Sequence, residues 1–174
     1  LVHNGIIENH EDLRRQLTEK GFTLTSETDS ELIAHLISDS LAKGCDLLAA
    51  VNAAVSCCKG AYALAIMHKS DPSRMIAVRS GSPLVIGFGI GENFIASDIL
   101  ALSHLAKQML YLEEGDVAEI TLNHHQVYDA EGNAVNREVH ANHTSTEQVG
   151  RGKYRHFMQK EIFEQAAAIS ATLE

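Results

Sequence analysis

The sequence predicts an α+β fold in which helices flank a sheet of mostly antiparallel strands, and three observations support this prediction. Apolar residues recur at helical spacing over residues 9–59 and again over residues 155–173. Between these stretches the apolar period shortens to two residues, which is typical of strands. Most connections between the expected strands are too short for the crossover that a parallel pair requires.

The first third of the chain is predicted to hold one strand and three helices. Residues 2–7 favour a strand end followed by a turn, because Asn4-Gly5 is first of all a turn dipeptide. Thr28 and Glu31 have the spacing of a capping box at the start of the second helix. Helices are expected over residues 9–20, 28–43 and 46–59, and a glycine follows each of them.

The middle of the chain is predicted to form the sheet. In the strand from Ala61 to Met67, Tyr62, Leu64 and Ile66 point one way and the alanines point the other. Both faces are apolar, so both should be covered, and the alanine face should let another layer approach closely. Further strands are expected over residues 75–79, 84–88, 93–96, 109–112, 117–122, 126–128 and 134–139, with turns that include Asp71-Pro72.

Two more helices complete the predicted elements. A short one is expected over residues 99–106, capped by Asp98. Residues 142–153 are polar and indicate a mobile connector, after which residues 155–173 favour a last helix. Helices before and after a sheet with two apolar faces suggest layers of helix, sheet and helix.

Composition bounds the class of protein. At 174 residues, 45% of them hydrophobic, the chain suits one domain with a packed core. The excess of 23 acidic over 14 basic side chains argues against nucleic acid and anionic membranes, which both reward clustered Lys and Arg. No apolar run is long enough to span a bilayer. A small-molecule partner is the expectation that remains.

The cysteines indicate a reducing compartment. Cys45, Cys57 and Cys58 are an odd number, and an adjacent pair rarely forms a disulfide without strain. Cys58 continues the apolar stripe of the third predicted helix, so it is interpreted as a small core residue. A reactive thiol needs an electropositive, partly exposed setting that this helix does not suggest.

Two polar clusters carry candidate chemistry. The alternative to a turn at Asn4-Gly5 is a pair of oxyanion donors, one from the side-chain amide and one from a backbone N–H that no Cβ crowds. Asp29 stands at the expected start of a helix, where the helix dipole favours a charged carboxylate suited to binding an ammonium.

Seven segments spread over nearly the whole chain carry a resemblance to a known family. They include His-Asn-Gly-Ile at 3–6, Ser-Glu-Thr-Asp at 26–29 and Arg-Ser-Gly-Ser-Pro-Leu at 79–84. In full, the segments are 2–9, 26–29 with 33–35, 59–62, 79–87, 92–98, 112–116 and 154–162. The first two are shared widely among amidotransferases with an N-terminal cysteine nucleophile. The later ones resemble the glutaminase domains of glutamine–fructose-6-phosphate aminotransferases.

The resemblance implies a fold and a boundary. The family fold is the four-layer αββα sandwich of N-terminal-nucleophile hydrolases, with mostly antiparallel sheets. Its nucleophile is a cysteine at the first position, whose own α-amino group acts as the base. This chain begins with Leu1. We therefore expect an incomplete domain, inactive by itself, with a partial glutaminase domain over residues 1–141 and a connector and helix over residues 142–174.

The resemblance also implies roles for individual residues. Asn4 Nδ2 and the Gly5 N–H would stabilise the oxyanion, and Asp29 would bind the α-amino group of glutamine. His3 would lie beside the bound glutamine as a packing or orienting residue, since the base in this family is the nucleophile's amine. No metal site is expected, because the histidines at 124, 125, 140 and 143 have no matching ligand set. The glycine-rich stretch 87–91 lies between strands, so it lacks the helix start of a nucleotide loop.

The parent reaction implied by the resemblance uses glutamine to convert fructose 6-phosphate to glucosamine 6-phosphate. The fructose 6-phosphate would bind to sugar-isomerase domains that this chain does not contain. No cofactor is implied, and a cytoplasmic homo-oligomer is expected. Two alternatives remain open: the glutaminase domain of another amidotransferase, such as the phosphoribosyl-pyrophosphate or asparagine-forming enzymes, and a non-catalytic binding module.

Overall fold

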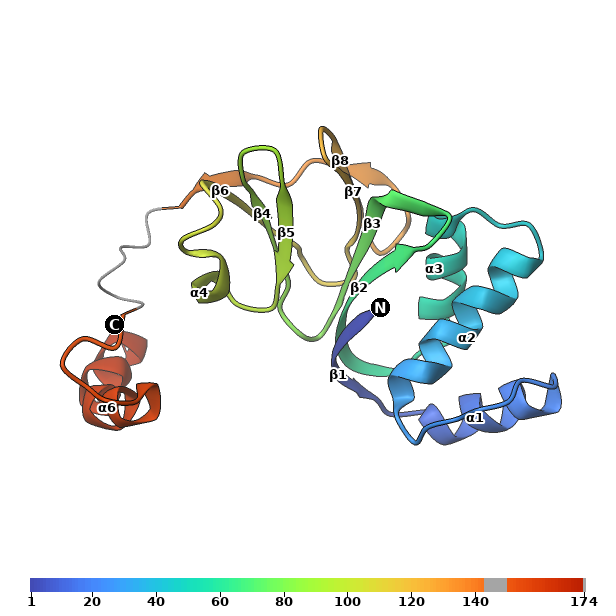
Figure 1. The fold of residues 1–174 in the computed structure, drawn as a ribbon, viewed down its shortest axis with the longest axis horizontal. Helices are drawn as coiled ribbons and strands as arrows, with labels where there is room; N and C mark the ends of the chain where they lie inside the picture. Colours follow the sequence, from blue (N-terminus) through green and yellow to red (C-terminus); the bar gives the residue numbers. More distant parts are fainter. Residues whose placement is uncertain (143–149, 174) are drawn as a thin grey trace. The chain divides into compact units, whose positions relative to one another are not determined.

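The computed structural model describes residues 1–142 and 150–173 (Figure 1). Residues 1–142 form one compact unit, and residues 143–174 belong to a second. In the second unit, helix α6 spans Phe157–Leu173, within the range predicted for the last helix. Much of the predicted connector, residues 143–149, lies outside the described residues. Within the described ranges, no helix is long and apolar enough to cross a membrane.

Three helices form the first layer of the larger unit: α1 (His10–Glu19), α2 (Asp29–Ala42) and α3 (Leu47–Val55). The Asp46 side chain caps α3 by accepting a hydrogen bond from the Ala49 N–H at 2.7 Å. This helix ends four residues earlier than predicted. The N–H groups of Cys57 and Cys58 bond to carbonyls three residues back, so the last turn tightens and the helix stops.

All pairs of named strands are antiparallel, as predicted, and they form two sheets. The larger sheet has the order β1-β2-β3-β7-β8-β9 and the smaller has the order β10-β6-β4-β5. The strands of the larger sheet are β1 (Val2–Ile7), β2 (Gly60–His68), β3 (Asp71–Ser80), β7 (Val117–Thr121), β8 (His125–Tyr128) and β9 (Ala134–Val135). Those of the smaller sheet are β4 (Val85–Phe88), β5 (Asn93–Ala96), β6 (Gln108–Tyr111) and β10 (Val139–Ala141).

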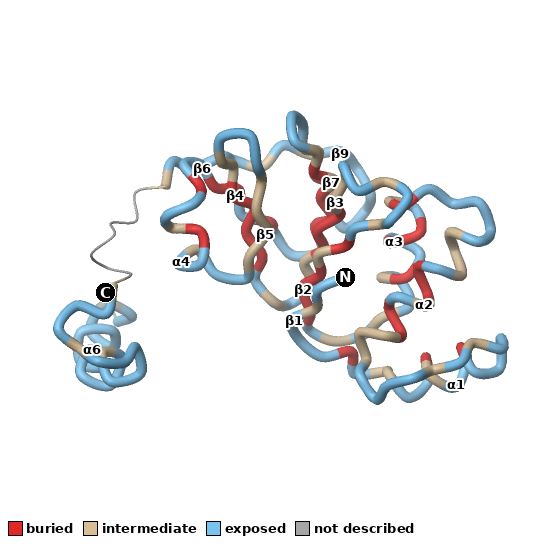
Figure 2. Tube along the Cα trace, in the orientation of Figure 1, coloured by how far each residue is buried: buried red, intermediate tan, exposed pale blue. Residues whose placement is uncertain are grey.

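The larger unit has four layers, in the order helix, sheet, sheet, helix, and a separate hydrophobic core lies between each two neighbouring layers. In the first core, Tyr62, Leu64 and Ile66 of β2 pack with buried residues of α1, α2 and α3. The second core lies between the sheets, where Ala63 and other residues of the larger sheet meet the smaller one. In the third, residues of the smaller sheet pack with Leu102 of the short helix α4 (Ile99–Leu102). Figure 2 shows these buried residues running along the sheet strands and the inner sides of the helices.

The predicted alternation along β2 is therefore confirmed. Its bulky residues face the helices, and Ala63 is buried against the second sheet, which the small alanine side chain lets come close. The layer that residue patterns alone did not predict is the second sheet itself. A helix, sheet, helix arrangement was expected, and the family resemblance supplied the fourth layer.

Three local predictions were wrong. The single strand predicted over 134–139 is two strands, β9 and β10, which belong to different sheets. The predicted turn at Asp71-Pro72 lies inside β3, because a bulge between Met67 and His68 lets the proline sit at the irregular end of the pairing. The predicted helix over 99–106 is regular only over Ile99–Leu102.

Candidate active site

Asn4 and Gly5 lie within strand β1, so the turn predicted from their residue types alone is wrong. Asn4 pairs with Ala63 and Gly5 with Tyr62 on β2. Gly5 has φ +122°, a conformation that L side chains rarely adopt. A Cβ at Gly5 would lie 2.2 Å from the Ala61 carbonyl oxygen, so the two backbones approach more closely than any other residue allows. The position requires glycine for both conformation and space.

The two faces of β1 differ in cover. Ile7 is fully buried in the core on the helix side, and the His3 side chain is 3% exposed. The alternate residues Val2 and Ile6 are 70% and 66% exposed. Asn4 shares their face and is also exposed. Since β1 is the outermost strand of its sheet, Asn4 lies on an open face next to an unpaired edge.

Asp29 is held against that edge at the first position of α2. The Thr28 hydroxyl caps the helix by accepting a hydrogen bond from the Ser30 N–H. Asp29 Oδ2 accepts a hydrogen bond from the Ile7 N–H at 2.9 Å. The Ile6 carbonyl oxygen points toward β2, since a Cβ added at Gly60 would lie 2.3 Å from it. In an extended strand, the N–H of the next residue points the opposite way, so the Ile7 N–H points to the outer edge of β1. The carboxylate thus lies along the free edge of β1.

His3 contacts the same carboxylate. Its Nδ1 lies 3.0 Å from Ser30 Oγ and 3.4 Å from Asp29 Oδ1. Its Nε2 is buried and has no hydrogen-bond partner among the described residues. The ring also packs edge-on against Tyr62, with centroids 6.4 Å apart. The structure therefore brings His3 and Asp29 together, whereas the Asn4 side chain lies on the opposite face of the strand.

The loop before α2 is fixed by Glu31 in a way that the capping-box prediction missed. The Glu31 carboxylate accepts hydrogen bonds from the N–H and hydroxyl groups of both Thr25 and Ser26, at 2.7–2.8 Å, and not from Thr28. The Ser26 hydroxyl, the Thr25 N–H and the Thr25 hydroxyl lower the pKa of Glu31 from 4.5 to about 2. Glu31 thereby fixes the conformation of the loop that leads to Asp29.

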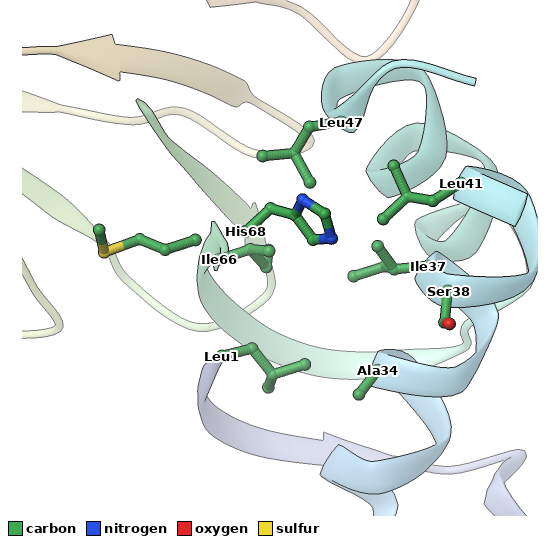
Figure 3. A pocket seen from close by; sticks show the side chains of 9 residues that line it. Leu1, Ala34, Ile37, Ser38, Leu41, Leu47, Ile66 and His68 are labelled. Carbon is green, nitrogen blue, oxygen red and sulfur yellow. The ribbon is translucent and has the colours of Figure 1, made fainter. Parts of the chain in front are cut away.

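A hollow lies elsewhere on the larger unit and contains none of these residues. Figure 3 shows apolar side chains of α2 together with Leu47, Ile66 and His68 around it, and Leu1 at its rim. Its lining is Leu1, Ala34, Ile37, Ser38, Leu41, Leu47, Ile66, Met67 and His68. It offers few polar groups to orient a ligand, so the candidate site is the edge of β1 and not this hollow.

The remaining candidates have ordinary surroundings. Cys45 and Cys57 are exposed, and burial, followed by the neighbouring Cys57 and Asp29, raises the pKa of the Cys58 thiol to about 11. Across residues 1–142 and 150–173, no group of three His, Cys, Asp or Glu side chains could hold a metal ion. His143 lies outside the described residues. The glycine-rich stretch 87–91 joins β4 to β5 and starts no helix.

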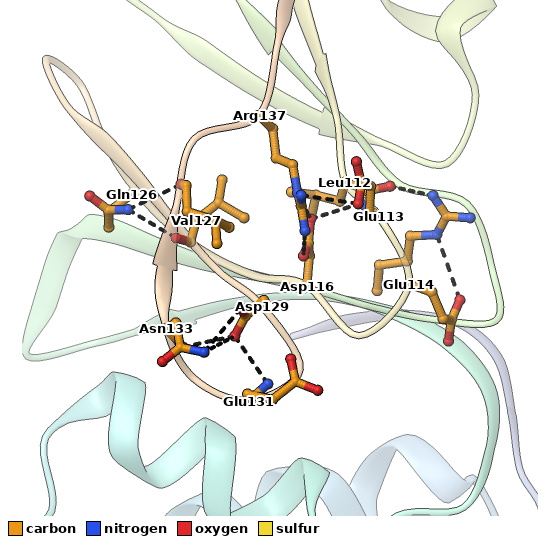
Figure 4. A network of polar contacts seen from close by, with 12 residues as sticks. Leu112, Glu113, Glu114, Asp116, Gln126, Val127, Asp129, Glu131, Asn133 and Arg137 are labelled. Atoms are coloured by element: carbon orange, nitrogen blue, oxygen red, sulfur yellow. Dashed lines mark hydrogen bonds and ion pairs between the residues drawn. The ribbon is translucent and has the colours of Figure 1, made fainter.

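Sequence reasoning missed a second polar cluster, shown in Figure 4. Asp116 is fully buried, and both of its carboxylate oxygens accept hydrogen bonds from Arg137 at 2.9 Å. Its Oδ2 also accepts from the Glu113 N–H at 2.7 Å. Arg137 stands where a continuous strand was predicted, so no sequence signal marked it as the partner of an acid 21 residues away.

Comparison with solved structures places the fold, two antiparallel sheets between helical layers, among the N-terminal-nucleophile amidotransferases. Glutamine phosphoribosylpyrophosphate amidotransferase from B. subtilis, solved with ADP and GMP, superposes with a TM-score of 0.64 at 28% identity, over 76% of this chain and 29% of that one. The fold is thus the αββα type that the family resemblance implied.

The chain belongs to the glutamine amidotransferase domain family, whose model matches residues 1–104. Similar proteins named glutamine–fructose-6-phosphate aminotransferase (isomerizing) match the whole chain. The proteins from Idiomarina loihiensis and Vibrio cholerae are 55% and 52% identical over 174 residues. The protein from Legionella pneumophila strain Paris is 53% identical over the same length. The chain spans 28% of the length of the first two relatives and 29% of the third.

Proposed function

We propose that this chain is part of the glutaminase domain of a glutamine–fructose-6-phosphate aminotransferase. The relatives with that name match all 174 residues at 55% identity and below, whereas the phosphoribosylpyrophosphate amidotransferase structure is 28% identical. This difference favours the first enzyme over the second. The observation that best supports a glutamine site is the position of the Asp29 carboxylate, which the Ile7 N–H holds at the free edge of β1.

In the proposed complex, glutamine lies along that edge. Its α-ammonium binds Asp29, and its amide carbonyl lies near Asn4 Nδ2 and the Gly5 N–H. Gly5 and Ile7 are two residues apart, about 7 Å along a strand. The α-nitrogen and amide carbon of an extended glutamine are about 5 Å apart, so one molecule can reach both groups.

The proposed chemistry is attack of a cysteine thiolate on the amide carbon, which places negative charge on the carbonyl oxygen. Donors that are already aimed at that oxygen stabilise the charge without reorganising. The α-amino group of that cysteine, which took the thiol proton, gives it to the amide nitrogen as the C–N bond breaks and ammonia leaves, and water then hydrolyses the thioester to glutamate and the free thiol. Cys58 is not proposed as the nucleophile, because its raised pKa keeps the thiol protonated. The nucleophile is the N-terminal cysteine that the family resemblance supplies.

The released ammonia would then convert fructose 6-phosphate to glucosamine 6-phosphate on sugar-isomerase domains outside this chain. The proposal includes residues 1–141 as glutaminase domain, residues 142–174 as the segment toward those domains, and a cytoplasmic homo-oligomer. His3 is proposed to orient Asp29, with which it makes its 3.4 Å contact.

The test is steady-state glutaminase kinetics on the full-length protein with its N-terminal cysteine. Asn4→Ala should lower kcat by ~10²-fold with a smaller change in KM, because the donor acts as the oxyanion forms. Asp29→Ala should mainly raise the KM for glutamine. The exposed residues Asn52 and Asp12, each changed to Ala, serve as matched controls. An Asn4 variant that changes KM alone would remove Asn4 from the transition state.

A further inference from the structure

Two segments that carry the family resemblance have no role in the glutaminase chemistry above: 79–87 and 112–116. The structure joins them. The Arg79 N–H donates to the Asp116 carbonyl at 2.9 Å, and the Gly115 N–H donates to the Arg79 carbonyl at 3.1 Å. The Gly81 N–H donates to both carboxylate oxygens of Glu114, at 2.8 and 3.0 Å. The bend after β3 is thus fastened to the turn before β7, and we call this contact the Glu114 clamp.

The clamped bend contacts β2 at the residue that pairs with the candidate site on β1. Gly81 forms a parallel bridge with Tyr62 on β2, and Tyr62 is the residue that pairs with Gly5 on β1. A Cβ at Gly81 would lie 2.6 Å from the Ala61 Cβ, and a Cβ at Gly5 would lie 2.2 Å from the Ala61 carbonyl oxygen. Three backbones are therefore in close contact across Ala61–Tyr62, with the oxyanion strand on one side and the clamped bend on the other.

Close packing of this kind transmits displacement. Gly5 and Gly81 each lie too close to Ala61 to leave room for a Cβ, and the Ala61 side chain is a single rigid methyl group, so no flexible side chain between them can absorb a shift. The Glu114 side chain is 65% exposed, yet its two carboxylate oxygens share one bifurcated hydrogen bond from the Gly81 N–H, and Arg79 Nε lies 4.0 Å from Oε2. A charged acceptor makes such bonds stronger than a neutral one.

We propose that Glu114 is a positioning residue for the glutaminase site: by holding Gly81 against Ala61–Tyr62, it sets the position of Gly5 and thus of the oxyanion donors. This inference rests on the proposed function, which supplies the reaction that the donors serve. Glu114 touches neither substrate nor donor and acts through the backbone of β2.

The kinetic test compares Glu114→Ala with Glu113→Ala in the full-length protein. Glu113 is the adjacent residue, equally exposed, and pairs with Arg137 instead of Gly81. Glu114→Ala should lower kcat for glutamine hydrolysis by ~10-fold and leave KM within about twofold, as expected for a small misplacement of reacting groups. Glu114→Gln, which keeps one oxygen acceptor for the Gly81 N–H, should recover most of that loss. Glu113→Ala should equal the wild type.

A second measurement does not need activity. In the chain itself, backbone amide spectra should show that Glu114→Ala shifts the signals of Gly81, Tyr62 and Gly5, and Glu114→Gln should shift the same signals less. Because Glu114→Gln keeps an acceptor, it preserves the fold and carries the test where the Ala variant does not fold. A shift of Gly81 with Gly5 unmoved, or wild-type kcat in folded Glu114→Ala, would overturn the proposal. Absence of glutaminase activity in the wild type would instead refute the proposed function, and the amide shifts would still decide whether the clamp reaches Gly5.

Discussion

Asp116 and Asp29 each accept a backbone N–H beside the larger sheet, but their surroundings are opposite. Asp116 is fully buried, and Arg137 donates a hydrogen bond to each of its carboxylate oxygens. The Asp29 side chain is 22% exposed, and its polar contacts among the described residues are with the Ile7 N–H and His3 Nδ1. Among the described residues, no Lys or Arg pairs with Asp29, whereas one does with Asp116. A carboxylate whose cation is another part of the fold has its charge already paired, whereas one without a cation can bind a ligand's ammonium.

The largest effect should follow from breaking the ion pair between Asp116 and Arg137. Asp116→Ala removes a fully buried acceptor of three hydrogen bonds and leaves the Arg137 guanidinium with only the exposed Glu113 as its ion-pair partner, a change that should cost about 3 kcal/mol. The free energy of unfolding, measured by urea denaturation, should fall by that amount. A loss below 1 kcal/mol would show that Glu113 alone compensates the charge of Arg137, and the contrast between the two carboxylates would fail.

The same substitution at Asp29 should cost less stability. Asp29→Ala removes one hydrogen bond from the Ile7 N–H and one acid from the first turn of α2, for about 1 kcal/mol in total. Denaturation of both variants under the same conditions checks the difference. Equal losses at Asp29 and Asp116 would mean that Asp29 is a structural residue and would weaken the case for a ligand there.

Acid should destabilise the loop before Asp29 within a defined range of pH. The pKa of Glu31 is lowered from 4.5 to about 2, so its hydrogen bonds to Thr25 and Ser26 stabilise the fold above pH 4.5. This contribution is lost as the pH falls from 4.5 to about 2. In Glu31→Gln, the free energy of unfolding should depend less steeply on pH within that window. Identical slopes for the variant and the wild type would contradict the assignment.

The smallest effect concerns Cys58, whose pKa reports the charge on Asp29. Burial is the largest cause of its raised pKa, followed by Cys57 and then Asp29. Asp29→Asn should therefore lower the pKa of Cys58 slightly and speed its alkylation by iodoacetamide, followed by mass spectrometry. The exposed Cys45 should react faster than Cys58 and at the same rate in both proteins. A Cys58 rate that does not respond would place the Asp29 charge farther from the thiol.

Local patterns predicted the elements well where one face of each is buried. The alternation of Tyr62 and Ala63 gave both faces of β2, because side-chain period follows directly from strand geometry. Patterns failed where the partner lies far away in sequence. Asn4-Gly5 suits a turn locally, yet pairing with β2 keeps it in a strand. Arg137 lies between two strands and binds Asp116, a contact over 21 residues that local patterns do not predict.

The candidate site was predicted from family resemblance more than from residue physics. Asp29 at a helix start could be inferred from the sequence, and its contact with the Ile7 N–H could not. The contact between Glu114 and Gly81 spans 33 residues and involves an exposed acid, which periodicity cannot distinguish from a solvated one. The roles of Asn4, Gly5, Asp29 and His3 stay predictions until the variants are measured.

The passage of the chain from β9 to β10 also gives the larger unit a mechanical property. Only Asn136, Arg137 and Glu138 separate the two strands, and they carry the chain from one sheet to the other. β10 is an edge strand held by three residue pairs to β6, so tension applied beyond Asn142 would peel it first. The peeling would stop at Arg137, which is anchored to buried Asp116 by two hydrogen bonds. Under load, this ion pair would keep the connection after β9 attached to the start of β7 even when β10 has left β6.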